Sequence, residues 1–266
     1  MLKKGWIFVS AIPRIFHARV RFGRKCPSIG LAVSCAWPDR YQFRRLPYDL
    51  ALARAGARVV TLVPSHLKRI DRMLKGIHGL VLAGGEDVHP KHSGAKEETA
   101  RGTSLDRDIF ELILLDKAAQ ARIPVLCICR GAQLLAVWAS GRLESQDHDE
   151  ERMKDHFSTF MRHAWHRVDM RPGTRLWNIF GGKPAHTNSF HHQVIADPGR
   201  LSIAAVAGKD NIEGVELPDE RFVVGVQWHP ELQAIFSDAN QRLFNTLVDE
   251  ARKVQSEKNQ VKKEIL

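Results

Sequence analysis

One cysteine and one histidine–glutamate pair have the residue types and surroundings of a nucleophilic catalytic triad. Cys129 follows the apolar run Pro124–Ile128 and precedes a segment with helical spacing, so it is expected at a strand-to-helix elbow. His229 and Glu231 follow a second apolar run, Val223–Trp228. A helix N-terminus behind the sulfur favours a thiolate, the histidine can take or hold the proton, and the carboxylate can orient the imidazole. The pattern predicts a Cys-His-Glu triad.

A glycine pair and the residue after the cysteine can supply the donors of an oxyanion hole. Gly84-Gly85 follows the apolar run Ile77–Ala83, and glycine tolerates the dihedral angles that turn a backbone N–H toward a developing negative charge. The N–H of Arg130 is the natural second donor, as at other nucleophile elbows. Active sites of open parallel sheets lie at the carboxyl ends of strands, so these segments and the His-Pro-Glu segment are expected at one edge.

Each feature also has an ordinary structural interpretation. An isolated cysteine on a strand is usually core, Gly-Gly is usually a turn, and His-Pro-Glu usually starts a helix. Cys127 and Cys129, with His191-His192, could instead suggest a metal site, because alternation along a strand would place both cysteines on one face. No ligand spacing of a known zinc type is present, and the joint occurrence of the three segments favours the triad, so we expect no metal.

The composition is that of an ordinary globular protein. The chain has 266 residues, of which 44% are hydrophobic and 26% charged. No apolar run reaches the ~18 residues of a membrane span, so no integral membrane segment is expected. Residues 1–25 carry seven lysine and arginine residues and no acid, so most of the net charge of +10 lies in an end segment. We therefore expect a solvated basic arm and no nucleic-acid partner.

The start of the chain and its cysteines bear on localisation. Met1–Ile12 has a basic start and a short apolar stretch, a faint resemblance to a signal peptide, but Pro13 and Arg14 interrupt it and no clear cleavage site follows. An interfacial arm, or a start codon placed too far upstream, explains the segment at least as well. Four cysteines in so long a chain do not resemble a disulfide framework, so a cytoplasmic protein is expected.

Alternating strands and helices must position the candidate triad. The expected strands are 27–33, 58–63, 77–83 and 124–128. The expected helical segments are 48–55, 67–74, 105–121 and 129–139. This alternation indicates an α/β fold with a mostly parallel sheet covered on both faces.

After Gly141 the pattern changes to shorter β runs, for which we expect mostly antiparallel pairing. They are 164–170, 201–207, 212–216 and 222–227, preceded by a charge-rich surface stretch, 147–154. A last helix, 235–254, leads into a charged tail. The expected division is a basic arm (1–25) outside the fold, one catalytic domain (26–255) and a C-terminal tail (256–266).

Five segments carry a resemblance to a known family. They are Leu82–Pro90, Asp106–Glu111, Ile128–Gln133, Thr187–Gln193 and Gly225–Glu231. From about residue 27 to 250, the chain resembles class I glutamine amidotransferase-like proteins, and most closely the gamma-glutamyl-gamma-aminobutyrate hydrolase group. The resemblance implies a flavodoxin-like three-layer sandwich and hydrolysis of a small gamma-glutamyl amide through a thioester on Cys129, as in polyamine catabolism. It implies no cofactor, and a homodimer stays open.

The resemblance also implies roles for individual residues. His229 would act as base and then as acid toward the departing amine, with Glu231 as its orienter. The N–H groups of Gly85 and Arg130 would form the oxyanion hole. The residues expected to line the glutamyl pocket are Gln133, Ser189, Phe190, His191, His192 and Gln193. For the two histidines taken alone, a structural role in the pocket loop is the better expectation.

Three positions depart from the family pattern. Cys127 stands where the family has glycine, two residues before the nucleophile, and we expect a shifted elbow and not a broken one. Ser93 replaces a tyrosine, and Ser140-Gly-Arg-Leu143 replaces Gly-Gly-Thr-Leu, which leaves the amine open. Two alternatives therefore stand beside the hydrolase: a glutaminase subunit that delivers ammonia to a separate synthetase, and a non-catalytic binding module.

Overall fold

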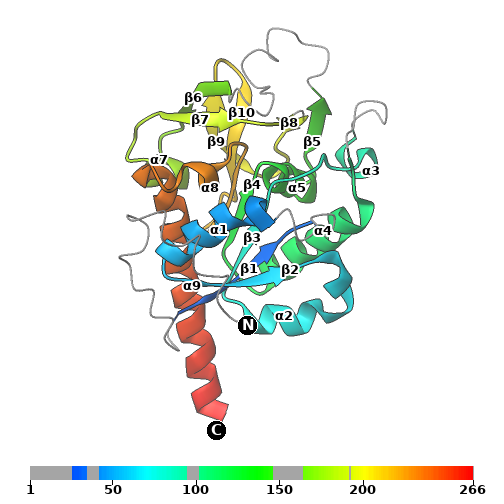
Figure 1. The fold of residues 1–266 in the computed structure, drawn as a ribbon, viewed down its shortest axis with the longest axis vertical. Helices are drawn as coiled ribbons and strands as arrows, with labels where there is room; N and C mark the ends of the chain where they lie inside the picture. Colours follow the sequence, from blue (N-terminus) through cyan, green and yellow to red (C-terminus); the bar gives the residue numbers. More distant parts are fainter. Residues whose placement is uncertain (1–25, 35–41, 95–101, 146–163, 192, 266) are drawn as a thin grey trace, which may run out of the picture.

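A central β-sheet runs through the molecule, with helices packed on both of its faces (Figure 1). The computed structural model describes residues 26–34, 42–94, 102–145, 164–191 and 193–265. The expected basic arm, the charge-rich stretch 147–154 and the side chain of His192 lie outside the described residues. Nine of the eleven described strands form one path in the order β2-β1-β3-β4-β11-β10-β9-β6-β7.

One half of this sheet is parallel and carries the candidate site. Its strands are β1 (Ser28–Ala32), β2 (Arg58–Leu62), β3 (Gly79–Leu82), β4 (Val125–Ile128) and β11 (Val223–Val226). Neighbouring strands from β2 through to β11 all pair in parallel. Strands β1, β3, β4 and β11 are short and buried at every residue, as expected for strands covered on both faces, whereas the edge strand β2 is mostly half-buried. The prediction of an α/β fold with a mostly parallel core is confirmed.

Two separate apolar cores cover the two faces of the parallel half. Helices α1 (Gln42–Arg54) and α9 (Asp238–Ile265) pack on one face, and α7 (Arg175–Ile179) extends this core by packing against α9. Helices α2 (Ile70–Gly76), α4 (Leu105–Gln120) and α5 (Arg130–Trp138) pack on the other. The layers are therefore helix, sheet and helix, which is the expected three-layer sandwich.

The second half of the sheet is antiparallel. It contains β6 (Ala164–Met170), β7 (Ala185–Ser189), β9 (Ser202–Ala207) and β10 (Asn211–Glu216), with β5 (Arg142–Ser145) and β8 (Gln193–Asp197) off the main path. The sequence did not predict β5, β7 or β8. Strand β11 belongs to both halves, because it pairs in parallel with β4 and antiparallel with β10.

Two helices are longer than predicted. Helix α1 begins at Gln42, six residues before the predicted start, with Pro47 inside it. Helix α9 continues to Ile265, so the expected charged tail is helical as far as that residue. The extension has a partner, because Lys258 Nζ donates to the carbonyl oxygens of Leu74 (3.1 Å) and Ile77 (2.8 Å) at the end of α2. Whether 256–266 lies outside the functional domain stays a prediction.

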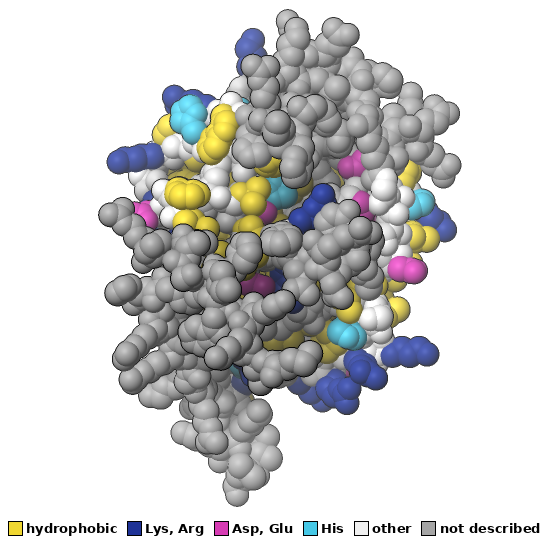
Figure 2. Space-filling view, in the orientation of Figure 1, with side chains coloured by type: hydrophobic (Ala, Val, Ile, Leu, Met, Phe, Trp, Pro, Cys, Tyr) yellow, Lys and Arg dark blue, Asp and Glu magenta, His cyan; other side chains and the backbone are white. Residues whose placement is uncertain are grey.

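The described surface carries a group of basic side chains over the 3₁₀ turn η2 (Pro64–Arg69) and α2. These two elements expose Lys68, Arg69, Arg72 and Lys75, and Figure 2 shows Lys and Arg side chains gathered there. Within the described residues, no helix is both long enough and apolar enough to cross a membrane.

Candidate active site

Cys129 occupies the sharp turn between β4 and α5. Its backbone has φ 52° and ψ −107°, a conformation that non-glycine residues rarely adopt. The turn is held from both sides, because Cys129 N donates to Val226 O (2.8 Å) and Cys129 O accepts from Gln133 N (3.1 Å). A Cβ on Gly131 would lie 2.5 Å from Leu82 O, so only glycine lets α5 start this close to β3. The predicted elbow is therefore present.

Cys127 is a core residue on the other side of the sheet. It packs among the side chains of α4 and α5, whereas Cys129 packs with the α1 and α9 core. The expectation that alternation would place both cysteines on one face is wrong, because the chain turns at Cys129. The residue opposite Cys127 on β11 is Gly225, so no side chain of β11 lies beside the thiol at this register position. Burial, and then the charge of Glu111, raises the pKa of Cys127 well above its ordinary value.

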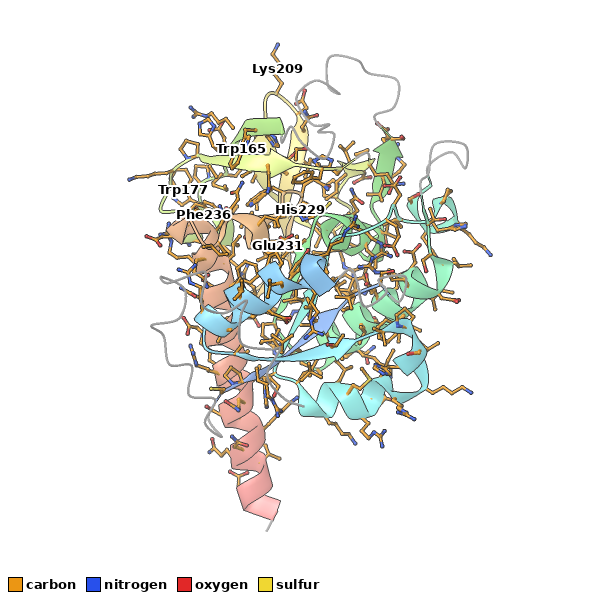
Figure 3. All side chains as sticks on the ribbon, in the orientation of Figure 1. Trp165, Trp177, Lys209, His229, Glu231 and Phe236 are labelled. Carbon is orange, nitrogen blue, oxygen red and sulfur yellow. The ribbon has the colours of Figure 1, made fainter. Side chains whose placement is uncertain are left out.

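His229 and Glu231 lie at the end of β11, where the short helix α8 (Pro230–Gln233) begins. His229 Nδ1 lies 2.6 Å from Glu231 Oε1, so the carboxylate accepts the Nδ1–H bond and fixes the ring (Figure 3). Burial alone would lower the pKa of His229, but the charge of Glu231, followed by that of Cys129, raises it well above its ordinary value. The raised pKa favours the imidazolium form of His229 at a site that also holds Cys129.

Gly84 is the point at which the three predicted segments meet. A Cβ on Gly84 would lie 2.7 Å from His229 Cε1, 3.4 Å from Cys129 Cβ and 3.5 Å from Tyr48 Oη. A side chain there would collide with the histidine, so the glycine is required for the close approach. The structure thus brings Cys129, His229 and Glu231 together with the Gly84-Gly85 turn and with Arg130.

Tyr48 and Asn188 also hold this site, and sequence reasoning gave them no role. The Tyr48 hydroxyl accepts from Gly84 N (3.1 Å), and burial, followed by the charge of Glu231, raises the Tyr48 pKa well above its ordinary value. Asn188 Oδ1 accepts from His229 N (2.9 Å), and Asn188 Nδ2 donates to His229 O (3.4 Å). Asn188 lies inside a segment that carried the family resemblance, whereas nothing near Tyr48 in the sequence indicates its contact.

Three of the predicted glutamyl-pocket residues, Gln133, His191 and Gln193, form a buried hydrogen-bond network beside the site. Gln133 Nε2 donates to Gln193 O (2.7 Å), and His191 Nδ1 donates to the same oxygen (3.1 Å). The Gln193 side chain binds both backbone groups of Val88, at 3.0 and 3.2 Å. These contacts join β8 to α5 and to the loop after Gly85. They fit the expectation that the His191 part of this loop is structural.

The remaining predicted pocket residues differ in their placement. Phe190 packs edge-on against the His229 ring, with the ring centres 5.4 Å apart. Ser189 is fully buried at the end of β7. His191 also faces Glu213, and although burial acts to raise the pKa of Glu213, hydrogen bonds from His166 and His191 lower it to about 2.

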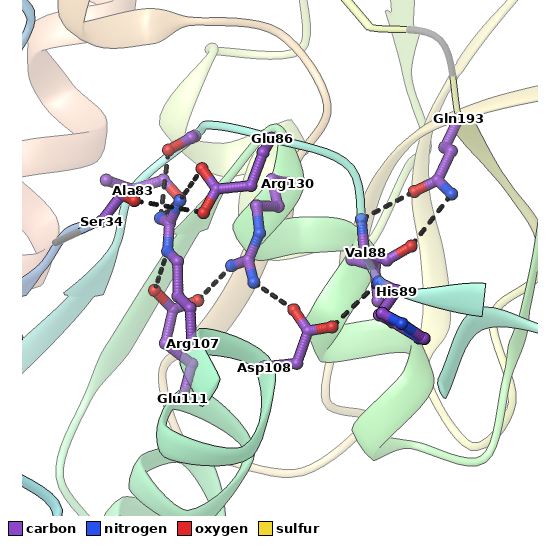
Figure 4. A network of polar contacts seen from close by, with 11 residues as sticks. Ser34, Ala83, Glu86, Val88, His89, Arg107, Asp108, Glu111, Arg130 and Gln193 are labelled. Atoms are coloured by element: carbon purple, nitrogen blue, oxygen red, sulfur yellow. Dashed lines mark hydrogen bonds and ion pairs between the residues drawn. The ribbon is translucent and has the colours of Figure 1, made fainter. Parts of the chain in front are cut away.

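A buried cluster of ionic residues lies under the elbow and the glycine turn (Figure 4). We define this ionic cluster as Glu86, Arg107, Asp108, Glu111 and Arg130. Its members are joined in a chain by Arg107–Glu86 (2.7 Å), Arg107–Glu111 (2.7 Å), Arg130–Glu111 and Arg130–Asp108. Among the described residues, no group of histidine, cysteine, aspartate and glutamate side chains is arranged to hold a metal ion.

Comparison with known proteins assigns the chain to a family. The Peptidase C26 family model matches residues 34–231. A Schizosaccharomyces pombe protein named "Putative glutamine amidotransferase PB2B2.05" is 32% identical over 232 residues, covering 86% of this chain and 88% of that protein. The gamma-glutamyl-gamma-aminobutyrate hydrolase of Escherichia coli O157:H7 is 26% identical over 171 residues, covering 61% of this chain and 67% of that protein.

Solved structures support the fold. The glutaminase domain of Trypanosoma brucei CTPS with bound acivicin superimposes with a TM-score of 0.63 at 15% identity, covering 85% of this chain and 94% of that domain. At this identity the likeness shows the fold alone. The family and the similar relatives support a hydrolase of the glutamine amidotransferase-like class.

Proposed function

Since this chain belongs to the peptidase C26 family, we propose that it hydrolyses the gamma-glutamyl amide bond of a small gamma-glutamyl compound. Gamma-glutamyl-gamma-aminobutyrate, an intermediate of polyamine breakdown, is an example of the class. The observation that carries the proposal is the grouping of Cys129, His229 and Glu231 around Gly84, with Glu231 only 2.6 Å from the histidine ring. Such a grouping suits covalent catalysis by a thiolate.

The first half of the reaction forms a thioester. The Cys129 thiolate attacks the γ-carbonyl carbon, and the carbonyl π electrons move to the oxygen, which becomes an oxyanion. The backbone N–H groups of Gly85 and Arg130 bind that oxyanion. The intermediate then collapses: the C–N bond breaks, His229 donates its proton to the nitrogen, and the free amine leaves. Glu231 holds the imidazole in the orientation that this transfer needs.

The second half of the reaction consumes one water molecule. Neutral His229 takes a proton from water as its oxygen attacks the thioester carbonyl, and the same two N–H groups bind the second oxyanion. Collapse breaks the C–S bond, releases glutamate and returns the thiolate beside the imidazolium. The sum is one amide and one water converted into one amine and one glutamate.

The pocket residues shape the site more than they contact the substrate. Gln133, His191 and Gln193 form hydrogen bonds with one another and with Val88, and Gln133 also donates to Gln227. We propose that they fix the walls around the glutamyl head. We further propose that Phe190, whose ring meets His229, contacts the departing amine. The 26% identical hydrolase supports the gamma-glutamyl class and leaves the amine open.

A second function is favoured by the names of more similar relatives. The 32% identical Schizosaccharomyces pombe protein carries the name of a glutamine amidotransferase. A glutaminase subunit would use the same thioester chemistry on glutamine and pass ammonia to a separate synthetase.

A substrate panel on the purified protein separates the two functions. The panel contains glutamine and the gamma-glutamyl amides of amines with and without a carboxylate, and the measurement is glutamate release. We expect turnover of at least one substituted amide by the protein alone, and none by Cys129→Ala. Activity on glutamine that appears only with a partner would favour the glutaminase. Equal turnover by Cys129→Ala would rule out both.

A further inference from the structure

Arg107 is fully buried beneath the glycine turn, and the reaction above assigns it no step. Its Nη2 donates to Ala83 O and to Gly84 O, both at 3.1 Å (Figure 4). One guanidinium thus holds the carbonyl oxygens of two successive peptide units. A planar fork of N–H donors suits this task, which a lysine ammonium cannot reproduce in the same geometry.

These two bonds determine where the Gly85 N–H points. Gly84 O and Gly85 N–H belong to one trans peptide unit, so they project in opposite directions. With Gly84 O turned down to Arg107, the Gly85 N–H is turned to the opposite side of the turn. Gly84 itself borders His229 and Cys129, so the glycine turn lies against the candidate triad. The Gly84 N–H is already engaged by Tyr48.

Carboxylates keep the Arg107 guanidinium in place. Glu86 and Glu111 accept from it at 2.7 Å each, on two different nitrogen atoms. The Arg107 guanidinium leaves no room for a side chain at position 85, because a Cβ on Gly85 would lie 2.2 Å from Arg107 Nη1. With Arg107 in this position, only glycine fits at position 85.

The second predicted oxyanion-hole donor, the Arg130 N–H, is also oriented by a hydrogen bond to the carbonyl oxygen of its own peptide unit. Cys129 O accepts from Gln133 N inside the first turn of α5, so the Arg130 N–H of that peptide unit points away from the helix. The Arg130 side chain is anchored below by Glu111 and Asp108. Glu111 contacts both arginines, and so it ties the glycine turn to the elbow.

We propose that Arg107 is a positioning residue that sets the oxyanion hole by fixing the Gly84–Gly85 peptide, with Glu111 joining it to the elbow. The inference deepens the proposed function and rests on it. Arg107 touches no reacting atom, and it acts through the backbone.

The test compares amide hydrolysis with alkylation of Cys129 in Arg107→Lys. Hydrolysis develops an oxyanion, so kcat should fall by about 100-fold, the usual effect of losing one such donor, while KM changes by less than about threefold. Alkylation of Cys129 by iodoacetamide forms no oxyanion, so its rate constant should stay within about twofold. A general disturbance of the elbow or the triad would lower both rates.

Two further variants keep the test decisive. Glu86→Gln loosens one anchor of the guanidinium at a less buried position, and it should lower kcat by about tenfold with the same unchanged alkylation. Arg175→Lys is the matched control, because Arg175 also donates to a carboxylate and to two carbonyl oxygens, far from the site. It should hydrolyse substrate at the unchanged rate.

The outcomes separate the inference from the proposed function. Unchanged kcat in folded Arg107→Lys and Glu86→Gln, with normal turnover by the unaltered protein, would overturn the inference alone. A parallel loss of hydrolysis and alkylation would assign Arg107 a purely structural role and would also overturn it. No turnover of any gamma-glutamyl amide by the unaltered protein would overturn the proposed function and the inference with it.

Discussion

The two strand ends that meet at the candidate site are held by different kinds of contact. At the end of β4, the elbow rests on buried charges, through Arg130, Glu111 and Arg107. At the end of β11, the His229 backbone is held by the neutral amide of Asn188. At the end of β4, the charged side chains hold the backbone in position. At the end of β11, the close ion pair is His229 with Glu231, and we assign this pair a role in the reaction.

The largest effect on stability is expected from breaking the charged end. Glu111→Gln keeps the shape of the side chain but leaves two buried arginines short of a carboxylate, so the free energy of unfolding should fall by about 3–5 kcal/mol. Urea denaturation measures it. The control is Asp71→Asn, which removes the more exposed pair with Lys117 and should cost at most about 1 kcal/mol. A similar loss in both variants would remove the distinction between the two ends.

A smaller effect on stability is expected from removing the reactive charge at the other end. The loss here is catalytic more than structural: Glu231→Gln should lower kcat by up to about 10⁴-fold, because the ring loses its orienting carboxylate. The raised pKa of His229 keeps the imidazolium present as pH rises past its ordinary value, and activity falls only when the pH passes the raised pKa. Without the Glu231 charge, this alkaline limb should move to lower pH. An unmoved limb in the pH profile of kcat/KM would argue against the assigned pair.

A still smaller effect is expected from removing the neutral contact between Asn188 and the His229 backbone. Asn188→Ala removes two hydrogen bonds to the His229 backbone, so the free energy of unfolding should fall by about 1–2 kcal/mol and kcat by about tenfold. Urea denaturation and steady-state kinetics test the two parts. A stability loss as large as that of Glu111→Gln would show that the amide end is no weaker than the charged end.

The smallest effect on activity is expected at Cys127, which neighbours the elbow but faces the other core. Cys127→Ala deletes one buried sulfur, so stability should fall by about 1 kcal/mol while kcat stays unchanged. A large loss of kcat would mean that the atypical residue of the elbow takes part in the site.

The sequence predicted those parts of the site that follow an apolar strand. Cys129, His229 and the glycine pair were found because each comes directly after such a run. The side chains that hold them were not, because their contacts span the chain: Tyr48 meets Gly84 across 36 residues, and Arg107 meets Ala83 across 24. No local pattern marks a contact of this kind.

The missed elements have equally physical reasons. Strand β7 reads Ala-His-Thr-Asn-Ser and shows no apolar alternation, yet it pairs with five residues of β6 and is buried along most of its length. The last turns of α9 are strongly charged, and they are held by Lys258, whose ammonium binds carbonyl oxygens at the end of α2. In both cases a tertiary contact outweighs the local sequence.

The most direct test of the account is to identify the atom that becomes covalently bound during turnover. The protein is mixed with a gamma-glutamyl amide that it turns over, quenched in acid within the first turnovers, and digested for peptide mass spectrometry. The account predicts a glutamyl group on Cys129, with Cys26 and Cys127 unmodified and with no adduct in Cys129→Ala. A glutamyl group on another residue, or turnover with no adduct at Cys129 under conditions that trap acyl intermediates, would contradict it.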